Sequence, residues 1–305
     1  MVGMTDEELL KELTPVASAL VERHLANAKE WFPHELVPWG RGRDFEPGEA
    51  WCPDQAPMDE AVRSSLFVNL LTEDNLPHYF RTIDDLFSQD DPWGAWTRRW
   101  TAEEGRHSIV IRDYLTVTRA VDPVALERGR MSQVCNAQVP RPASVADGLT
   151  YVAMQELATR IAHGNTGRLL TDDVGRKVMA RVAGDEYLHH VFYRDLVSAL
   201  IDFDPSTAMI AIDHNVREFS MPGTGIPGFA AHARAIANAG IYDFAAHHDL
   251  ILEPVVLGAW RVESLTGLSA EAETARDRCL AYIGKLRKVS RRAAGRRDSR
   301  THAVA

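Results

Sequence analysis

The chain has 305 residues, 45% of them hydrophobic and 25% charged, which is ordinary for a soluble globular protein. Its formal net charge of -9 argues against nucleic acid as the main partner, because phosphate binding favours a basic surface. The charge is uneven: from position 280 onward eight basic residues accompany one acidic residue, so this end carries about +7 and the rest about -16 (-9 minus +7). We therefore expect one helical domain over residues 1–285 and a basic, flexible tail over residues 286–305. The tail is either a solvated end or a docking surface for an acidic partner.

The three cysteines, Cys52, Cys135 and Cys279, are far apart and form no CxxC motif, which excludes a zinc cluster or a disulfide framework. The first residues are acidic and lack an apolar core segment, which argues against a signal peptide. No run approaches the roughly 18 apolar residues that a transmembrane helix needs. A cytoplasmic location without a membrane span is therefore expected.

Apolar residues recur at three- and four-residue spacing, whereas alternating β-branched runs are nearly absent, so the predicted class is all-α. Helices are expected, in chain order, over residues 5–30, 58–88, 92–119, 144–167, 171–202, 204–219, 227–238, 242–258 and 269–295. Prolines make residues 33–57 an irregular connection and break the chain again near positions 140 and 222. Pro77 falls inside the 58–88 pattern and is expected to kink that helix.

Two of these helices carry a Glu-x-x-His pair within an apolar stripe. The pairs are Glu104 with His107 and Glu186 with His189. A buried carboxylate is costly unless something pairs with it, and residues three apart on a helix lie side by side. Each pair is therefore placed to bind one metal ion.

The other two core helices each add one carboxylate, Glu73 and Glu156. Two single glutamates and two Glu-x-x-His pairs from four helices are the ligand pattern of ferritin-like di-iron and di-manganese bundles. Four carboxylates in an apolar core repel one another, and two cations about 3.5–4 Å apart would neutralise them. The predicted fold is thus a ferritin-like four-helix bundle with additional helices. Asp74, next to Glu73, remains an alternative ligand.

An acidic residue precedes one ligand in each pair: Glu103 stands before Glu104, and Asp185 before Glu186. A metal-bound histidine usually donates its second ring N–H to a carboxylate, so these acids could serve the histidines of the facing helices crosswise. The alternative is that they are exposed acidic neighbours. His190 is interpreted as a surface or supporting residue, because His189 keeps the matching spacing.

Several segments together resemble the soluble acyl-[acyl-carrier-protein] desaturases, a family that includes the plastid stearoyl enzyme. The similar segments are Thr72–Tyr79, Trp96–His107, Gln155–Thr159, His163–Thr166, Asp185–His189, Ser220–Pro222 and Leu265–Glu271. The likeness runs from about residue 12 to 290, and the Trp-Thr-Ala-Glu-Glu-x-x-His segment is its most specific part.

This resemblance implies a homodimer with two iron ions that uses O2 and electrons from ferredoxin to insert a cis double bond into a chain held on acyl carrier protein. The implied iron ligands are Glu73, Glu104, His107, Glu156, Glu186 and His189. Thr159 matches a family threonine that could relay a proton, or it is a small packing residue. Trp31 and Trp100 match family tryptophans near the site, either for electron transfer or for core packing. The family motif has two glutamates where this chain has Glu73-Asp74, so chain length and double-bond position are not predicted.

Other functions of a di-metal bundle are weighed against desaturation. The radical subunit of ribonucleotide reductase would need a tyrosine where Ile111 stands. A monooxygenase that hydroxylates an acyl substrate differs in its product, and an iron-storage protein of the ferritin kind would be a much shorter chain. Membrane desaturases are excluded, because neither membrane spans nor HxxHH clusters occur.

Overall fold

The computed structural model describes residues 4–137, 139, 141–221, 223 and 225–304, with side chains described up to Arg292. Within these residues all regular secondary structure is helical, which confirms the all-α prediction. The longer helices are α1 (Asp6–Asn27), α3 (Glu60–Glu73), α4 (Leu76–Leu86), α5 (Asp91–Val117), α6 (Pro123–Asn136), α7 (Val145–Leu169), α8 (Asp173–Phe203), α9 (Pro205–Glu218), α10 (Phe229–Asn238) and α12 (Ala270–Val304). Short helical turns are α2 (Pro33–Leu36), η1 (Trp39–Arg41), η2 (Pro53–Gln55), α11 (Phe244–His247) and η4 (Val262–Ser264), and η3 (His248–Ala259) is a π-helix.

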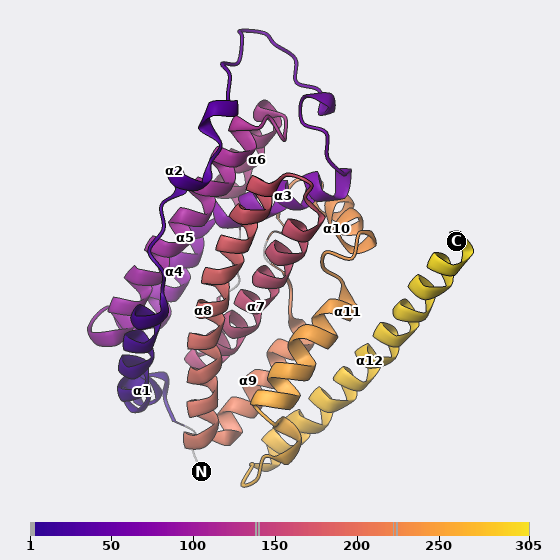
Figure 1. Cartoon of the computed structure of the whole chain (residues 1–305). Helices are drawn as coiled ribbons and strands as arrows, with labels where there is room; N and C mark the ends of the chain where they lie inside the picture. The colour runs from indigo at the N-terminus through magenta and orange to yellow at the C-terminus, as the bar shows by residue number, and fades with distance from the viewer. Residues whose placement is uncertain (1–3, 138, 140, 222, 224, 305) are drawn as a thin grey trace.

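Helices α3, α5, α7 and α8 form a closed bundle in which α3 contacts α5 and α7, and α8 contacts the same two helices (Figure 1). Around it, α1 covers α5 and α8, α4 lies against α5 and α7, and α9 joins α7 to α12. This is the predicted ferritin-like four-helix core with additional helices.

Local sequence signals explain where the core helices begin. Ser144 and Asp172 accept hydrogen bonds from backbone N–H groups in the first turns of α7 and α8, and Asp59 does so for α3. Such N-caps each stabilise a helix by about 1 kcal/mol, because they pair N–H groups that have no partner within the helix. Three of the four core helices, α3, α7 and α8, therefore start where the sequence supplies an acidic or hydroxyl cap.

The apolar core is divided into two layers by a polar layer. On α5 the tryptophans before Glu103 belong to one apolar cluster, and the residues from Val110 to Leu115 belong to the other. On α8 the order is reversed, with Val178–Val182 in the second cluster and Phe192–Leu200 in the first. The antiparallel helices thus bring both Glu-x-x-His pairs to the same level, between two water-excluding layers.

Two sequence-based expectations about helices were wrong. The segment 58–88 is not one kinked helix: α3 ends at Glu73, and Pro77 lies in the first turn of a separate helix, α4. Proline suits that place because it needs no hydrogen-bond partner for its nitrogen there. Helix α6 was not expected, because residues 123–136 show little segregation of apolar and polar faces, and only three of them are buried, Leu126, Gly129 and Gln133.

The C-terminal helix α12 continues through Val304 and projects away from the bundle (Figure 1). Arg278 and Arg287 on its first part pair with Asp213 and Glu253. Side chains beyond Arg292 lie outside the described residues. The division into a domain and a flexible tail remains a prediction.

Candidate metal centre

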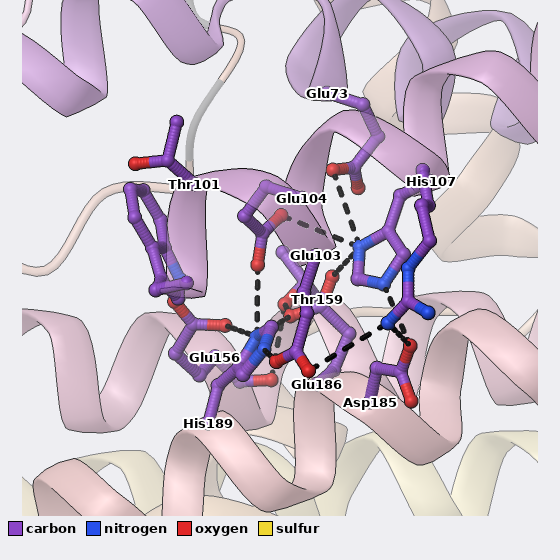
Figure 2. A network of polar contacts seen from close by, with 12 residues as sticks. Glu73, Thr101, Glu103, Glu104, His107, Glu156, Thr159, Asp185, Glu186 and His189 are labelled. Carbon is purple, nitrogen blue, oxygen red and sulfur yellow. Dashed lines mark hydrogen bonds and ion pairs between the residues drawn. The ribbon is translucent and has the colours of Figure 1, made fainter. Parts of the chain in front are cut away.

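The six predicted ligand residues converge in the polar layer of the bundle (Figure 2). Each is at most 6% exposed, and they come from all four core helices. They are Glu73 at the end of α3, Glu104 and His107 on α5, Glu156 on α7, and Glu186 and His189 on α8. Residues up to 116 positions apart in the sequence therefore meet at one buried point, as the spacing predicted.

These residues form two overlapping groups of four whose ligand atoms lie within 4.8 Å of one another. One group contains Glu73 and His107, the other contains Glu156 and His189, and both contain Glu104 and Glu186. Two such groups that share two carboxylates could hold two cations side by side, with one Glu and one His at each end.

The Nδ1 atoms of His107 and His189 face carboxylate oxygens without making hydrogen bonds. His189 Nδ1 lies 2.8 Å from Glu104 Oε1, and His107 Nδ1 lies 3.3 Å from both Glu104 and Glu186. Yet both nitrogens and Glu104 Oε1 are buried without a hydrogen-bond partner among the described residues. Buried polar atoms that point at one another but remain unpaired fit a site built for a cation between them. The donor set of this cluster can therefore hold metal ions.

The electrostatics of the cluster support the same interpretation. Burial, and after it the negative charge of Glu186, raises the pKa of Glu104. The pKa of Glu156 is raised well above its usual value by burial and by the charges of Glu186 and Glu104. Burial alone would also raise the pKa of Glu73, but its interactions with His107 and His163 lower it. Two carboxylates are thus hard to ionise without added positive charge, which divalent cations would supply.

The crosswise arrangement of Glu103 and Asp185 is confirmed. His189 Nε2 hydrogen-bonds to Glu103 Oε2 at 3.0 Å, and His107 Nε2 lies 3.5 Å from Asp185 Oδ2, which is long for a hydrogen bond. Burial alone would raise the pKa of Asp185. Contacts with His107, Trp31 and Arg181 outweigh burial and lower this pKa to about 2. Each acid therefore stays ionised and orients the histidine of the facing helix, and neither is the exposed neighbour of the alternative interpretation.

Two neighbouring residues are separated from the ligand set. Asp74 caps α3 and accepts a hydrogen bond from Arg130 on α6 at 2.5 Å, so its carboxylate is already paired outside the cluster. His190 belongs to neither group, but it is buried and its Nδ1 lies 2.7 Å from the carbonyl oxygen of Ala153. Of the two interpretations of His190, a surface residue was therefore wrong and a supporting residue remains, while its exclusion from the ligands agrees with the geometry.

Sequence reasoning missed two histidines that support the centre. His163 on α7 contacts Glu73 Oε1 at 3.0 Å, and His24 on α1 contacts Glu103 Oε2 at 2.9 Å. His163 stands seven residues after Glu156, two turns along the same helix face, and this spacing is the signal that could have found it. His24 gives no such signal, because α1 lies outside the four-helix core.

Thr159 and Trp100 also contact the cluster. Thr159 Oγ1 lies 3.1 Å from Glu186 Oε2, and it also lies within hydrogen-bond distance of two carbonyl oxygens of its own helix. Its single proton can serve one of these acceptors at a time. Trp100 donates its indole N–H to Glu156 Oε1 at 3.1 Å. Both residues therefore orient ligand carboxylates from the side of the bundle that faces a cavity.

This cavity has a volume of about 350 Å³ and borders the cluster at Glu73, Glu104 and Glu186. Between these carboxylates and its far end its walls are formed by residues of α4 and α7, mostly apolar or aromatic: Tyr79, Thr82, Ile83, Leu86, Tyr151, Val152 and Gln155. An apolar ligand would fit it with part of its length beside the candidate metal ligands.

Comparison with known proteins gives the family. The sequence profile of the fatty acid desaturases matches residues 5–305. The chain belongs to the fatty acid desaturase family. The desaturase is 41% identical to DesA1 of Mycobacterium tuberculosis over 293 residues, which cover 93% of this chain and 86% of that protein. It is 29% identical to the chloroplastic stearoyl-[acyl-carrier-protein] 9-desaturase of Spinacia oleracea, covering 95% of this chain and 74% of the relative.

A solved structure has the same fold. The X-ray structure of DesA2 from Mycobacterium tuberculosis superposes with a TM-score of 0.70 at 28% identity, covering 88% of this desaturase and 98% of DesA2. In the described part of the desaturase, none of the helices combines the length and apolar character that crossing a bilayer requires. The fold and family expected from the resemblance are therefore confirmed.

Proposed function

We propose that this chain is an O2-dependent di-iron desaturase that introduces a cis double bond into an acyl chain carried on acyl carrier protein. The proposal rests on one observation: the two four-residue groups border a largely apolar cavity. The names of DesA2 and the spinach relative, both acyl-[acyl-carrier-protein] desaturases, support the same substrate class.

The residues that would hold the two iron ions are Glu73, Glu104, His107, Glu156, Glu186 and His189. Mixed carboxylate and imidazole donors suit iron or manganese better than softer metals. When bound, iron supplies the activation of O2 and the oxidation of two adjacent methylenes. The overall balance is that a CH2–CH2 unit, O2, two electrons and two protons give CH=CH and two waters.

The protein's own residues position the acyl chain, exclude water from it and supply protons. The apolar cavity walls hold the acyl chain beside the carboxylates and exclude bulk water, which protects the reaction from side products. Thr159 Oγ, 3.1 Å from Glu186 Oε2, can hold a proton next to the centre and pass it on. No side chain is required as a nucleophile.

Electrons would come from a ferredoxin-type donor. Trp31 donates its indole N–H to Asp185 at 2.8 Å, and Asp185 in turn faces His107. This chain of contacts connects the segment after α1 to one metal ligand, and we propose it as the electron path. A homodimer and a cytoplasmic location complete the proposal, and acidic acyl carrier protein would suit the basic C-terminal end.

A di-iron hydroxylase is the second candidate, because the same centre could insert oxygen into the chain instead of removing hydrogens. A non-enzymatic iron-binding protein is the third. The deciding experiment incubates iron-loaded protein with saturated acyl carrier proteins of several lengths, ferredoxin, its reductase and O2. Mass spectrometry of the acyl product should show a loss of two hydrogens. Addition of one oxygen would favour the hydroxylase, and consumption of reductant with no altered acyl chain would contradict both enzymatic proposals.

A further inference from the structure

One end of the cavity is lined by buried amide side chains. The first turn of α4 and the last turn of α6 meet there, since His78 Nε2 lies 2.7 Å from the carbonyl oxygen of Val134. Asn75 and Gln133 lie in these two turns and both line the cavity. Gly225 covers this end: a Cβ at Gly225 would lie 3.6 Å from Gln133 Oε1. Gly225 itself is exposed, so this end of the cavity lies close to the protein surface.

The amide oxygens at this end have no partners. Asn75 is 2% exposed and Gln133 3% exposed, yet Asn75 Oδ1 and Gln133 Oε1 receive no hydrogen bond from any described residue. Burying an unpaired amide oxygen is costly, and native proteins rarely leave one without a partner or a ligand. Two such atoms beside one cavity therefore indicate that a ligand with hydrogen-bond donors lies between them.

At the opposite end of the cavity, the buried carboxylate of Asp147 already has hydrogen-bond partners. Asp147 there accepts hydrogen bonds from His214 at 2.6 Å, from Asn215 at 2.7 Å and from the backbone N–H of Ala143 at 3.0 Å, so its carboxylate is satisfied within the protein. Beside it, the end of the Leu86 side chain and the ring of Pro142 pack against Gly148, so a Cβ there would have to displace Leu86 Cδ2. Leu86 and Pro142 narrow the cavity beside Gly148 and give it an apolar surface there, which suits the terminus of a hydrocarbon chain.

We propose that Asn75 and Gln133 form an amide cradle that binds the carbonyl end of the substrate, by accepting hydrogen bonds from the amide N–H groups of the pantetheine arm next to the thioester. The inference rests on the proposed function and adds the direction of the acyl chain. Neither side chain carries a formal charge, so the cradle matches neutral amides and not the phosphate of the arm. The methyl end then points to the wall at Gly148, and the cradle sets which methylenes stand beside the metal centre.

The direction also gives the cradle a role in regioselectivity. Gly148 and Thr159 are separated by 11 residues of α7, so the wall lies about 16 Å along the helix from the metal centre. A substrate anchored only by its apolar tail could slide along this distance, because apolar contacts have no fixed register. Hydrogen bonds at the carbonyl end would fix one register, which makes Gln133 a positioning residue.

The test replaces Gln133 with methionine, which has nearly the same shape but no amide. The matched control is Asn136→Met, which removes an amide from the exposed end of the same helix, outside the cavity. Dissociation constants are measured on iron-loaded full-length protein for two ligands with the same saturated acyl chain, a pantetheine thioester and a methyl ester. Thermal unfolding and the position of the product double bond are measured alongside.

For Gln133→Met we expect the Kd of the acyl-pantetheine to rise about five- to tenfold, as for one lost hydrogen bond, with the Kd of the methyl ester unchanged. The melting temperature should not fall, because the Gln133 side chain makes no hydrogen bond to the described residues, and the double bond should spread over neighbouring positions. Asn136→Met should behave as wild type in binding.

Equal weakening of both ligands would place the effect in cavity shape and overturn the cradle. So would unchanged binding of the acyl-pantetheine together with a single double-bond position. If the wild type binds acyl-pantetheine but forms no alkene, the proposed function fails while the binding comparison still decides the cradle.

Discussion

His247 should make the stability of this protein depend on acid in a measurable way. Its ring is 7% exposed, stacks on Phe219 with centroids 4.7 Å apart, and places Nδ1 2.9 Å from the hydroxyl oxygen of Tyr242. Burial, with a smaller contribution from His248, lowers the pKa of His247 to about 4. The native state therefore holds this imidazole neutral at pH values where an exposed histidine takes up a proton.

The sign and size of the effect follow from proton linkage. An unfolded chain binds a proton at His247 below about pH 6.5, whereas the native state does so only near its lowered pKa. Stability is therefore complete above pH 6.5 and is lost as the pH falls toward 4. Between pH 7 and pH 5 this residue alone should lower the free energy of unfolding by about 2 kcal/mol.

The assay is urea unfolding of wild type and His247→Gln at pH 7 and pH 5. Glutamine keeps an acceptor for Tyr242 but does not titrate, so the variant should lose some stability at pH 7 through the missing ring contact with Phe219. Its further loss on going to pH 5 should be about 2 kcal/mol smaller than that of wild type. His34→Gln, at an exposed position, is the matched control and should leave the pH dependence unchanged. The reasoning is refuted if wild type and His247→Gln lose equal stability between the two pH values.

Three further predictions concern the metal centre and the tail. Glu73→Gln should lower the iron content after loading from two ions toward one per chain, whereas Asp74→Asn should keep both ions; equal iron content by metal analysis would contradict the ligand choice. Glu103→Gln should weaken iron binding about 10- to 100-fold, because His189 loses its charged partner, and an unchanged titration with Fe2+ would exclude that role. The last prediction concerns four arginines in the last part of α12: Arg291, Arg292, Arg296 and Arg297. Their joint neutralisation should raise the KM for acyl carrier protein, and an unchanged KM would exclude docking there.

The convergence of the six candidate ligands was predictable because helical spacing is local. A carboxylate and an imidazole three residues apart within an apolar stripe are costly to bury, so the pattern around Glu104 and Glu186 indicated metal before any fold was known. The facing partners Glu103 and Asp185 were predictable for a related reason, since the antiparallel packing of α5 and α8 brings each next to the histidine of the other helix.

Features that depend on packing between distant segments were not predictable. His24 contacts Glu103 only because α1 lies over α5, and nothing in its sequence neighbourhood indicates that contact. Helix α6 was missed because it has few buried residues. Two of its residues nevertheless matter for the site: Arg130 pairs with Asp74, and Gln133 lines the cavity. The cavity itself is a product of these packings, so its direction and its ends could be read only from the structure.

The break between α3 and α4 explains how one short segment serves three purposes. In an uninterrupted helix, residues 73, 74 and 75 would point in directions about 100° apart, and only one of them could face the bundle interior. The chain leaves the helix after Glu73 instead, so Glu73 faces the metal cluster, Asp74 binds Arg130, and Asn75 turns its amide toward the cavity. Pro77 then starts α4 without a missing hydrogen bond. The proline that interrupts the helical pattern is therefore what allows a metal ligand and a substrate-facing amide to lie two residues apart.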